Sequence, residues 1–84
     1  MKLADLKRLP VGTEMRLTFS LMGPCDKARK IAKVSTTAIQ FTGDGIPDGR
    51  TSYLSFPKAA DFKPTETGFE IYEGATLCAR YLFK

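Results

Sequence analysis

Few residues in this 84-residue chain have the type and spacing that catalysis requires. Ser55 and Lys58 reproduce the Ser-x-x-Lys spacing in which a lysine activates a serine nucleophile. That chemistry also needs the serine at a helix start and further Ser-Asp-Asn and Lys-Thr-Gly elements, and the chain contains neither element. Cys25 has no histidine anywhere in the chain to act as its base. These residues therefore predict no nucleophilic catalysis.

The glycine-rich segment 43–49 is the nearest approach to a ligand-binding loop. It imitates a phosphate-binding Gly-x-Gly-x-x-Gly loop, but Asp48 stands where the last glycine belongs, and its carboxylates would repel a phosphate. Asp44 and Asp48 alone supply too few oxygens for calcium, which prefers six or more ligands. Two Asp-Gly pairs instead predict a hairpin turn. Four later acids are predicted to form a solvated face: Asp61, Glu66, Glu70 and Glu73. We predict no catalytic residue, no metal site and no cofactor.

Length and composition predict one small soluble domain over residues 1–84. The hydrophobic share of 43% and the charged share of 26% are those of an ordinary globular protein. Cys25 and Cys78 are too few for a disulfide scaffold and lack zinc-site spacing. No stretch has the apolar length of a signal peptide or of a membrane span of about 20 residues. We therefore expect a cytoplasmic protein with no membrane association.

Short segments with alternating apolar and polar residues predict β-strands. The clearest alternation runs through Met15, Leu17, Phe19 and Leu21. The strands expected from alternation and turn residues cover 14–21, 38–42, 50–56, 67–73 and 75–83. One helical turn is predicted at 57–62, with Pro57 at its first position. A short N-terminal helix or arm, Leu3 to Leu9, is expected to plug one end of the fold.

The segment 26–34 fits two structures. Ala28, Ile31 and Ala32 have helical spacing after a possible Asp26 cap. As a strand, the segment would turn Ala28, Ala32 and Val34 inward and Arg29, Ile31 and Lys33 outward. The tight corner at 35–37 favours the strand, which would be paired with 38–42. About six short strands then predict a mainly β fold, a single small antiparallel barrel.

Uneven charge suggests one kind of partner. The net charge of the chain is +4: residues 1–33 have a net charge of +5, and the remaining residues have a net charge of −1. A basic cluster on the predicted strand could neutralise phosphates, as nucleic-acid binding requires. Tyr53 and Tyr72 could stack on bases, because both alternate out of phase with apolar neighbours. The candidate nucleic-acid-binding residues are Lys27, Arg29, Lys30 and Lys33, with Lys7, Arg8 and Arg16 as possible additions.

A protein partner is the competing hypothesis. Exposed tyrosine, arginine and methionine are the residue types that contribute most at protein interfaces. Exposed edge strands could also pair with a partner strand or with another copy of the chain. The candidate protein-binding residues are Met22, Arg50, Tyr53, Tyr72 and Arg80.

Four segments carry a resemblance to short uncharacterised proteins of bacteriophages and mobile elements: 21–26, 33–39, 52–59 and 68–72. The resemblance extends over residues 11–72 and lies in turns and strands, so it assigns no residue a role. It implies a Src-homology-3-like or related barrel in a bacterial cytoplasm. It also implies an accessory role in which the protein blocks a surface of a host complex or sequesters a nucleotide signal.

The sequence thus favours a non-catalytic binding module, most concretely a phage-type inhibitor of a bacterial defence complex that acts by stoichiometric binding. The expected partner is a host protein or nucleoprotein complex. Direct nucleic-acid binding through the basic face is the second hypothesis. A homo-oligomer whose interfaces capture a small anionic nucleotide is the third. Mimicry of DNA is not expected, because a mimic must be strongly negative and this chain is positive.

Overall fold

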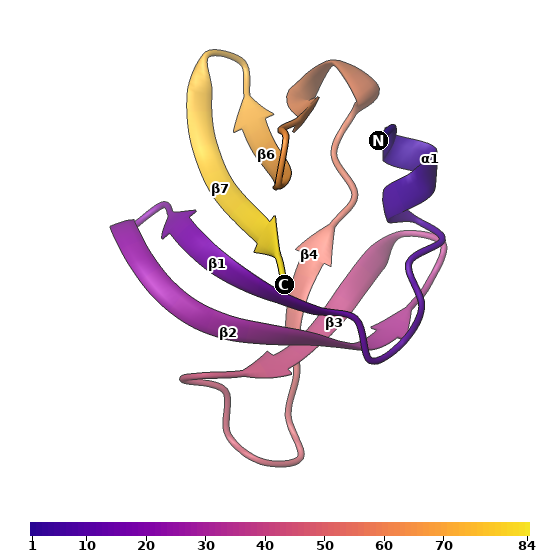
Figure 1. The fold of residues 1–84 in the computed structure, drawn as a ribbon, viewed down its shortest axis with the longest axis vertical. Helices are drawn as coiled ribbons and strands as arrows, with labels where there is room; N and C mark the ends of the chain where they lie inside the picture. The colour runs from indigo at the N-terminus through magenta and orange to yellow at the C-terminus, as the bar shows by residue number, and fades with distance from the viewer.

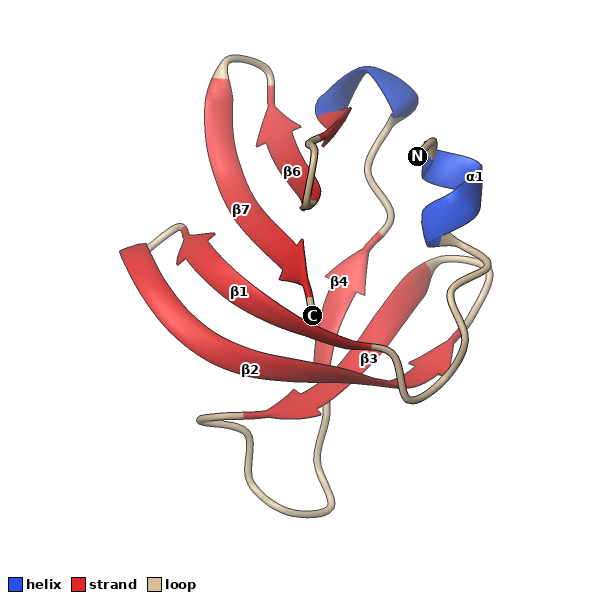
Figure 2. Ribbon diagram, viewed as in Figure 1, coloured by secondary structure: helices blue, strands red, loops and turns tan.

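Seven antiparallel strands form one sheet that curls into a half-barrel in the computed structural model, which describes residues 1–84 (Figure 1). The strands are β1 Glu14–Ser20, β2 Gly23–Val34, β3 Ala38–Gly43, β4 Ser52–Ser55, β5 Phe62–Pro64, β6 Gly68–Glu73 and β7 Thr76–Phe83. Their order across the sheet is β4-β3-β2-β1-β7-β6-β5. Figure 2 shows how little of the chain is helical: α1 covers Leu3–Leu6, and a 3-10 turn, η1, covers Ala59–Asp61.

This architecture confirms the predicted mainly β fold and its antiparallel sheet. The ambiguous segment 26–34 is a strand, and the strand already begins at Gly23, three residues before the segment for which a strand was considered. The helical turn is shorter than predicted and begins after Lys58 rather than at Pro57. One strand, β5, was not predicted, because Pro64 cannot donate a backbone hydrogen bond to a strand ladder. A proline is tolerated there because β5 lies at the edge of the sheet and pairs on one side only.

The sheet is not closed into a full barrel by hydrogen bonds, since β4 and β5 end the strand order and do not pair with each other. The N-terminal helix α1 adds its leucines to the core that the sheet encloses. Leu6 is 0% exposed, and Leu3 and Leu9 pack against the core from partly buried positions. A hydrogen bond from the Lys2 N–H to Asp5 Oδ2 at 2.7 Å holds the first turn. The predicted plug is therefore confirmed.

Aromatic rings fill the concave side of the sheet. The ring of Tyr81 on β7 stacks on Phe41 of β3 at 5.5 Å between centroids and on Phe69 of β6 at 5.0 Å. Phe62 and Phe83 lie against Phe69 at 5.6 and 5.8 Å. Burial raises the pKa of Tyr81 to about 12, so its phenol stays protonated. Rings from β3, β5, β6 and β7 thus meet in one core.

We predict that Leu6→Ala lowers the free energy of unfolding by about 2–5 kcal/mol, because it empties a fully buried position. Leu21→Ala is the matched control, since that leucine is 77% exposed. Its effect should stay within about 0.5 kcal/mol. Urea unfolding of both variants measures the difference. Equal small effects would show that α1 is not part of the folded core.

Candidate interaction surfaces

The five residues predicted to bind protein do not form one patch. Tyr72 on β6 and Arg80 on β7 come together across paired strands. Tyr53 lies on β4, and Arg50 lies in the loop that leads into that strand. Met22 stands apart, in the turn between β1 and β2. The structure therefore divides the predicted set among three places.

The side chains of Tyr72 and Arg80 both donate hydrogen bonds to the carboxylate of Glu70. Arg80 Nε donates to Glu70 Oε2 at 2.7 Å, and the Tyr72 hydroxyl donates to Glu70 Oε1 at 3.1 Å. The hydrogen bond from Arg80 is the main reason that the pKa of Glu70 is lowered. The bond to Glu70 raises the pKa of Tyr72. Lys63 Nζ lies 5.9 Å from the centre of the Tyr72 ring. These contacts join β5, β6 and β7, so this group stabilises the sheet.

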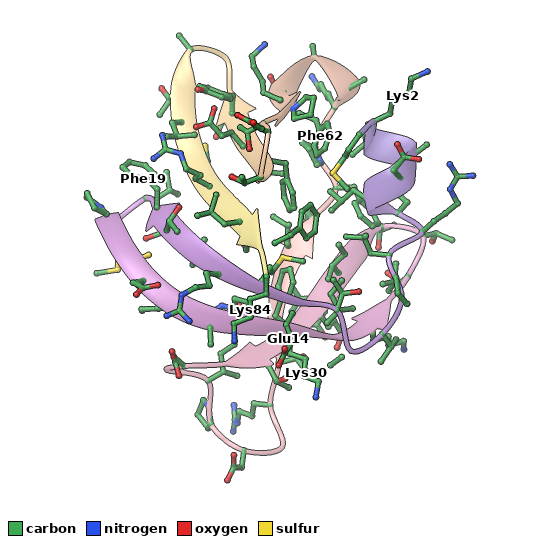
Figure 3. All side chains as sticks on the ribbon, in the orientation of Figure 1. Lys2, Glu14, Phe19, Lys30, Phe62 and Lys84 are labelled. Carbon is green, nitrogen blue, oxygen red and sulfur yellow. The ribbon has the colours of Figure 1, made fainter.

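The β1–β2 hairpin ends in an apolar tip, which we define as residues 19–24. Leu21 is 77% exposed and Met22 is 98% exposed, and no charged residue occurs between Leu17 and Cys25. Figure 3 labels Phe19 at this end of the hairpin, away from the core residue Phe62. The tip has ordered geometry: the Met22 N–H donates to Ser20 Oγ at 3.3 Å, and Gly23 adopts a φ of 107°. Glycine accepts such a φ most readily.

A β-bulge explains why the alternating pattern placed Leu21 wrongly. The pairing of β1 shifts between Leu17 and Phe19 against both neighbouring strands. An extra residue in a strand reverses which side chains face the core. Leu21 therefore does not face the core as Met15 and Leu17 do. The sequence signal for the tip was its lack of charge next to Gly23 and Pro24.

An ion pair closes the base of the same hairpin. Arg16 Nε donates to Asp26 Oδ1 at 2.5 Å, and both side chains remain partly exposed. The hydrogen bond from Arg16 lowers the pKa of Asp26 and in return raises that of Arg16. Arg16 and Asp26 are thus engaged with each other, and the tip itself carries no charge.

The predicted basic cluster is split between the two faces of β2. Arg29 pairs across the sheet with the buried Met15 and is only 9% exposed. Its Nη1 donates to the carbonyls of Ala28 at 2.9 Å and Asp44 at 2.8 Å, which fixes the start of the β3–β4 loop. Lys27 is also on the concave side, because it lies opposite Leu17. The predicted outward faces of Arg29 and Ile31 were therefore wrong, because both are buried, whereas Val34 packs against the core and Lys33 is exposed, as predicted.

Lys30 and Lys33 both lie on the convex side, because a bulge between Ile31 and Lys33 shifts the phase of the strand. Lys30 pairs with Glu14, and the Lys84 N–H donates to the Glu14 carbonyl at 3.3 Å. Figure 3 shows the labelled side chains of Lys30, Glu14 and Lys84 near one another. We call Lys30, Lys33 and Lys84 the convex lysines.

Tyr53 extends the convex surface toward the β4 edge. Lys33 lies opposite Gln40, and Gln40 lies opposite Tyr53, so the three side chains share the convex face. Tyr53 is 67% exposed. The convex lysines therefore lie on the same face as one exposed aromatic ring.

Two open pockets flank α1, and the first contains Lys7 and Arg8, which were possible additions to the predicted nucleic-acid-binding residues. The first, about 560 Å³, is lined by Lys7, Arg8, Leu9, Val34, Ser35 and Thr36. Its cations already have partners: Arg8 pairs with Asp5 at 3.0 Å, and Lys7 Nζ lies 5.4 Å from the centre of the Phe56 ring. The second, about 430 Å³, is mostly apolar and lies between α1 and the η1–β5 segment.

Groups considered for chemistry remain separate in space. Cys25 and Cys78 are both free thiols, and no three metal-ligating side chains come together. Asp44 Oδ2 accepts the Ala28 N–H at 2.9 Å, so this carboxylate holds the loop. None of the helices has the length and apolar character needed to cross a membrane.

No protein-family model matches the chain, and no curated protein or solved structure matches it either. The fold and the exposed residues therefore define only a class, a small mainly β protein with an exposed apolar hairpin tip and lysines on its convex face.

We predict that Glu70→Gln destabilises the protein by about 0.5–1 kcal/mol at neutral pH, since Arg80 is partly exposed and screened by solvent. The pKa of Glu70 is lower in the folded than in the unfolded state. The stabilisation is therefore present above the unfolded pKa and is lost as pH falls through the folded pKa. Urea unfolding near neutral pH and near pH about 3 should show the variant and the parent converging.

The matched control for that experiment is Glu73→Gln, because Glu73 is exposed and forms no ion pair. It should leave stability unchanged at both pH values. If Glu70→Gln and Glu73→Gln behave alike, the network is not a stabilising contact.

Proposed function

We propose that this protein is a non-catalytic binding module that associates stoichiometrically with a protein partner through the apolar tip. The observation that carries the proposal is the exposure of Leu21 and Met22, at 77% and 98%, on an ordered turn. Fully burying a leucine or methionine side chain contributes roughly 1.5–3 kcal/mol each. Contiguous exposed apolar patches mark protein-interaction sites, and Leu21 and Met22 are adjacent in this turn.

We further propose that the partner belongs to a bacterial defence complex and that binding inhibits it. The resemblance to short phage proteins supports this choice. The net charge of +4 suits an acidic partner surface, because opposite charge accelerates encounter. The tip would then provide the apolar contact after encounter. Such a module needs no catalytic residue.

The test replaces the tip and leaves the fold unchanged. Leu21→Ser with Met22→Ser should lower partner capture from nuclease-treated bacterial lysate by at least tenfold, about 1.4 kcal/mol. Val11→Ser is the matched control, because Val11 is an exposed apolar residue in the loop before β1. Thermal unfolding should be the same for both variants. Equal capture by parent and tip variant would refute the role of the tip.

The inhibitory role has its own readout. Expression of the parent protein in a bacterium that carries a defence system should restore phage plating, and the tip variant should not. If the defence system still blocks phage plating when the parent protein is expressed, the inhibitory role is contradicted. The evidence that the protein binds its partner would not be affected.

A second candidate function, nucleic-acid binding, has one observation in its favour, the convex lysines on the same face as Tyr53. Lysines could neutralise phosphates of a single strand while the exposed tyrosine ring stacks on a base. Arg29 and Lys27 have no part in this surface, since both lie on the concave side. The candidate interface is thus smaller than the cluster expected from sequence.

We predict that Lys30→Ala with Lys33→Ala weakens binding of a single-stranded oligonucleotide and reduces the salt slope by about 1–2. Lys27→Ala on the opposite face serves as control and should change neither quantity. Fluorescence anisotropy across a salt series measures both. An unchanged slope in the double variant would exclude the convex face as the phosphate contact.

A further inference from the structure

The two strands that end the sheet differ in how well their open edges are protected. An open edge is a template for pairing, and proteins commonly block it with lysine, proline or a bulge. β5 carries Lys63 and Pro64 within three residues. β4 has the sequence Ser-Tyr-Leu-Ser, with no charge, no proline and no break in its register with β3. Its edge is therefore open to another strand.

The hydrogen-bond pattern identifies which backbone groups β4 offers. The Phe56 N–H donates to the Thr37 carbonyl at 2.9 Å, so residues in phase with Phe56 face β3. Tyr53 and Ser55 are out of phase, and their N–H and C=O groups point away from the sheet. Both residues are exposed, and no strand pairs with β4 on that side. Two donors and two acceptors are thus available in register.

The charges that flank β4 select the occupant. Arg50 precedes the strand and Lys58 follows it, and neither forms an ion pair. Antiparallel pairing of two copies about Leu54 would set Arg50 of one copy opposite Lys58 of the other, at both ends. Like charges opposite each other destabilise a strand pair. An added strand with acidic residues at its ends would meet opposite charge instead.

We propose that β4 binds an extended segment of a partner protein as an added strand, and that this segment carries acidic residues at both ends. Backbone pairing would supply affinity and the flanking charges would supply selectivity. The inference rests on the proposed protein-binding function and specifies the chemistry of the partner. It uses a surface separate from the apolar tip.

The first test uses a fluorescent peptide, Glu-Thr-Val-Thr-Val-Thr-Val-Thr-Glu, and the same peptide with lysine at both ends. We expect the acid-ended peptide to bind about tenfold more tightly at low salt, from two favourable rather than unfavourable end contacts. Amide hydrogen exchange followed by NMR should slow at Tyr53 and Ser55 and stay unchanged at Leu54, which already faces β3. No slowing at these two amides would overturn the proposal.

The second test blocks the edge. Tyr53→Lys should abolish binding of the acid-ended peptide, although it adds a favourable charge. Thr42→Lys on β3 is the matched control and should retain binding, because β3 is paired on both sides. Tighter binding by both variants would show attraction by charge alone and contradict strand addition. Concentration-dependent dimerisation of the parent protein, lost in Tyr53→Lys, would assign the edge to a second copy instead.

The tip variant separates this inference from the proposed function. Leu21→Ser with Met22→Ser should keep full peptide binding, since the tip lies on another hairpin. Loss of partner capture in the tip variant with no peptide binding by the parent would leave the function standing and remove the inference. Partner capture that is retained in the tip variant and lost in Tyr53→Lys would refute the role of the tip and support β4 as the binding site.

Discussion

The stack of Phe41, Tyr81 and Phe69 is the contact on which the remainder of the fold depends. β3 and β7 are separated by β2 and β1 in the sheet, yet the rings of Phe41 and Tyr81 lie 5.5 Å apart. Only a strongly curled sheet can bring them together. Sheets acquire such curvature from twist and from bulges, and this sheet has register shifts in β1, β2 and β6. The curvature of the sheet and the packing of the aromatic core therefore depend on each other.

The curl also determines what stays exposed. The curl buries one face of the sheet, but β4 and β5 do not pair with each other. The core is therefore not enclosed by the sheet alone, and Leu6 of α1 contributes to it. The β1–β2 hairpin is longer than the core it covers, since β2 pairs with β3 only from Arg29 onward. Its tip therefore lies beyond the enclosed rings. In an 84-residue chain the core is small, and uncovered apolar residues follow from this geometry.

Much of this fold was predictable, because alternation and turn residues mark strands wherever the period of two is kept. Prediction failed at the bulges. Leu21 and Arg29 were assigned to the wrong faces, since one inserted residue reverses every later side chain and leaves no trace in composition. β5 was missed because Pro64 is compatible with an edge strand, and edge position depends on the whole topology. The exposed Met22 and Tyr53 were predicted, because their neighbours in sequence are turns and alternating strands.

The pairing of charges indicates how this surface recognises a partner. Arg80, Arg16 and Arg8 are each held by a carboxylate, and Arg29 is held by two carbonyls. Apart from Arg50 and the unpaired lysines, the features without an internal partner are different in kind: an apolar turn, an exposed tyrosine and the backbone of one edge strand. Such features bind by burying apolar area and by forming main-chain hydrogen bonds, whereas the remaining lysines act at longer range and are weakened by salt. The geometry thus favours an extended protein contact with electrostatic guidance over a compact anion site.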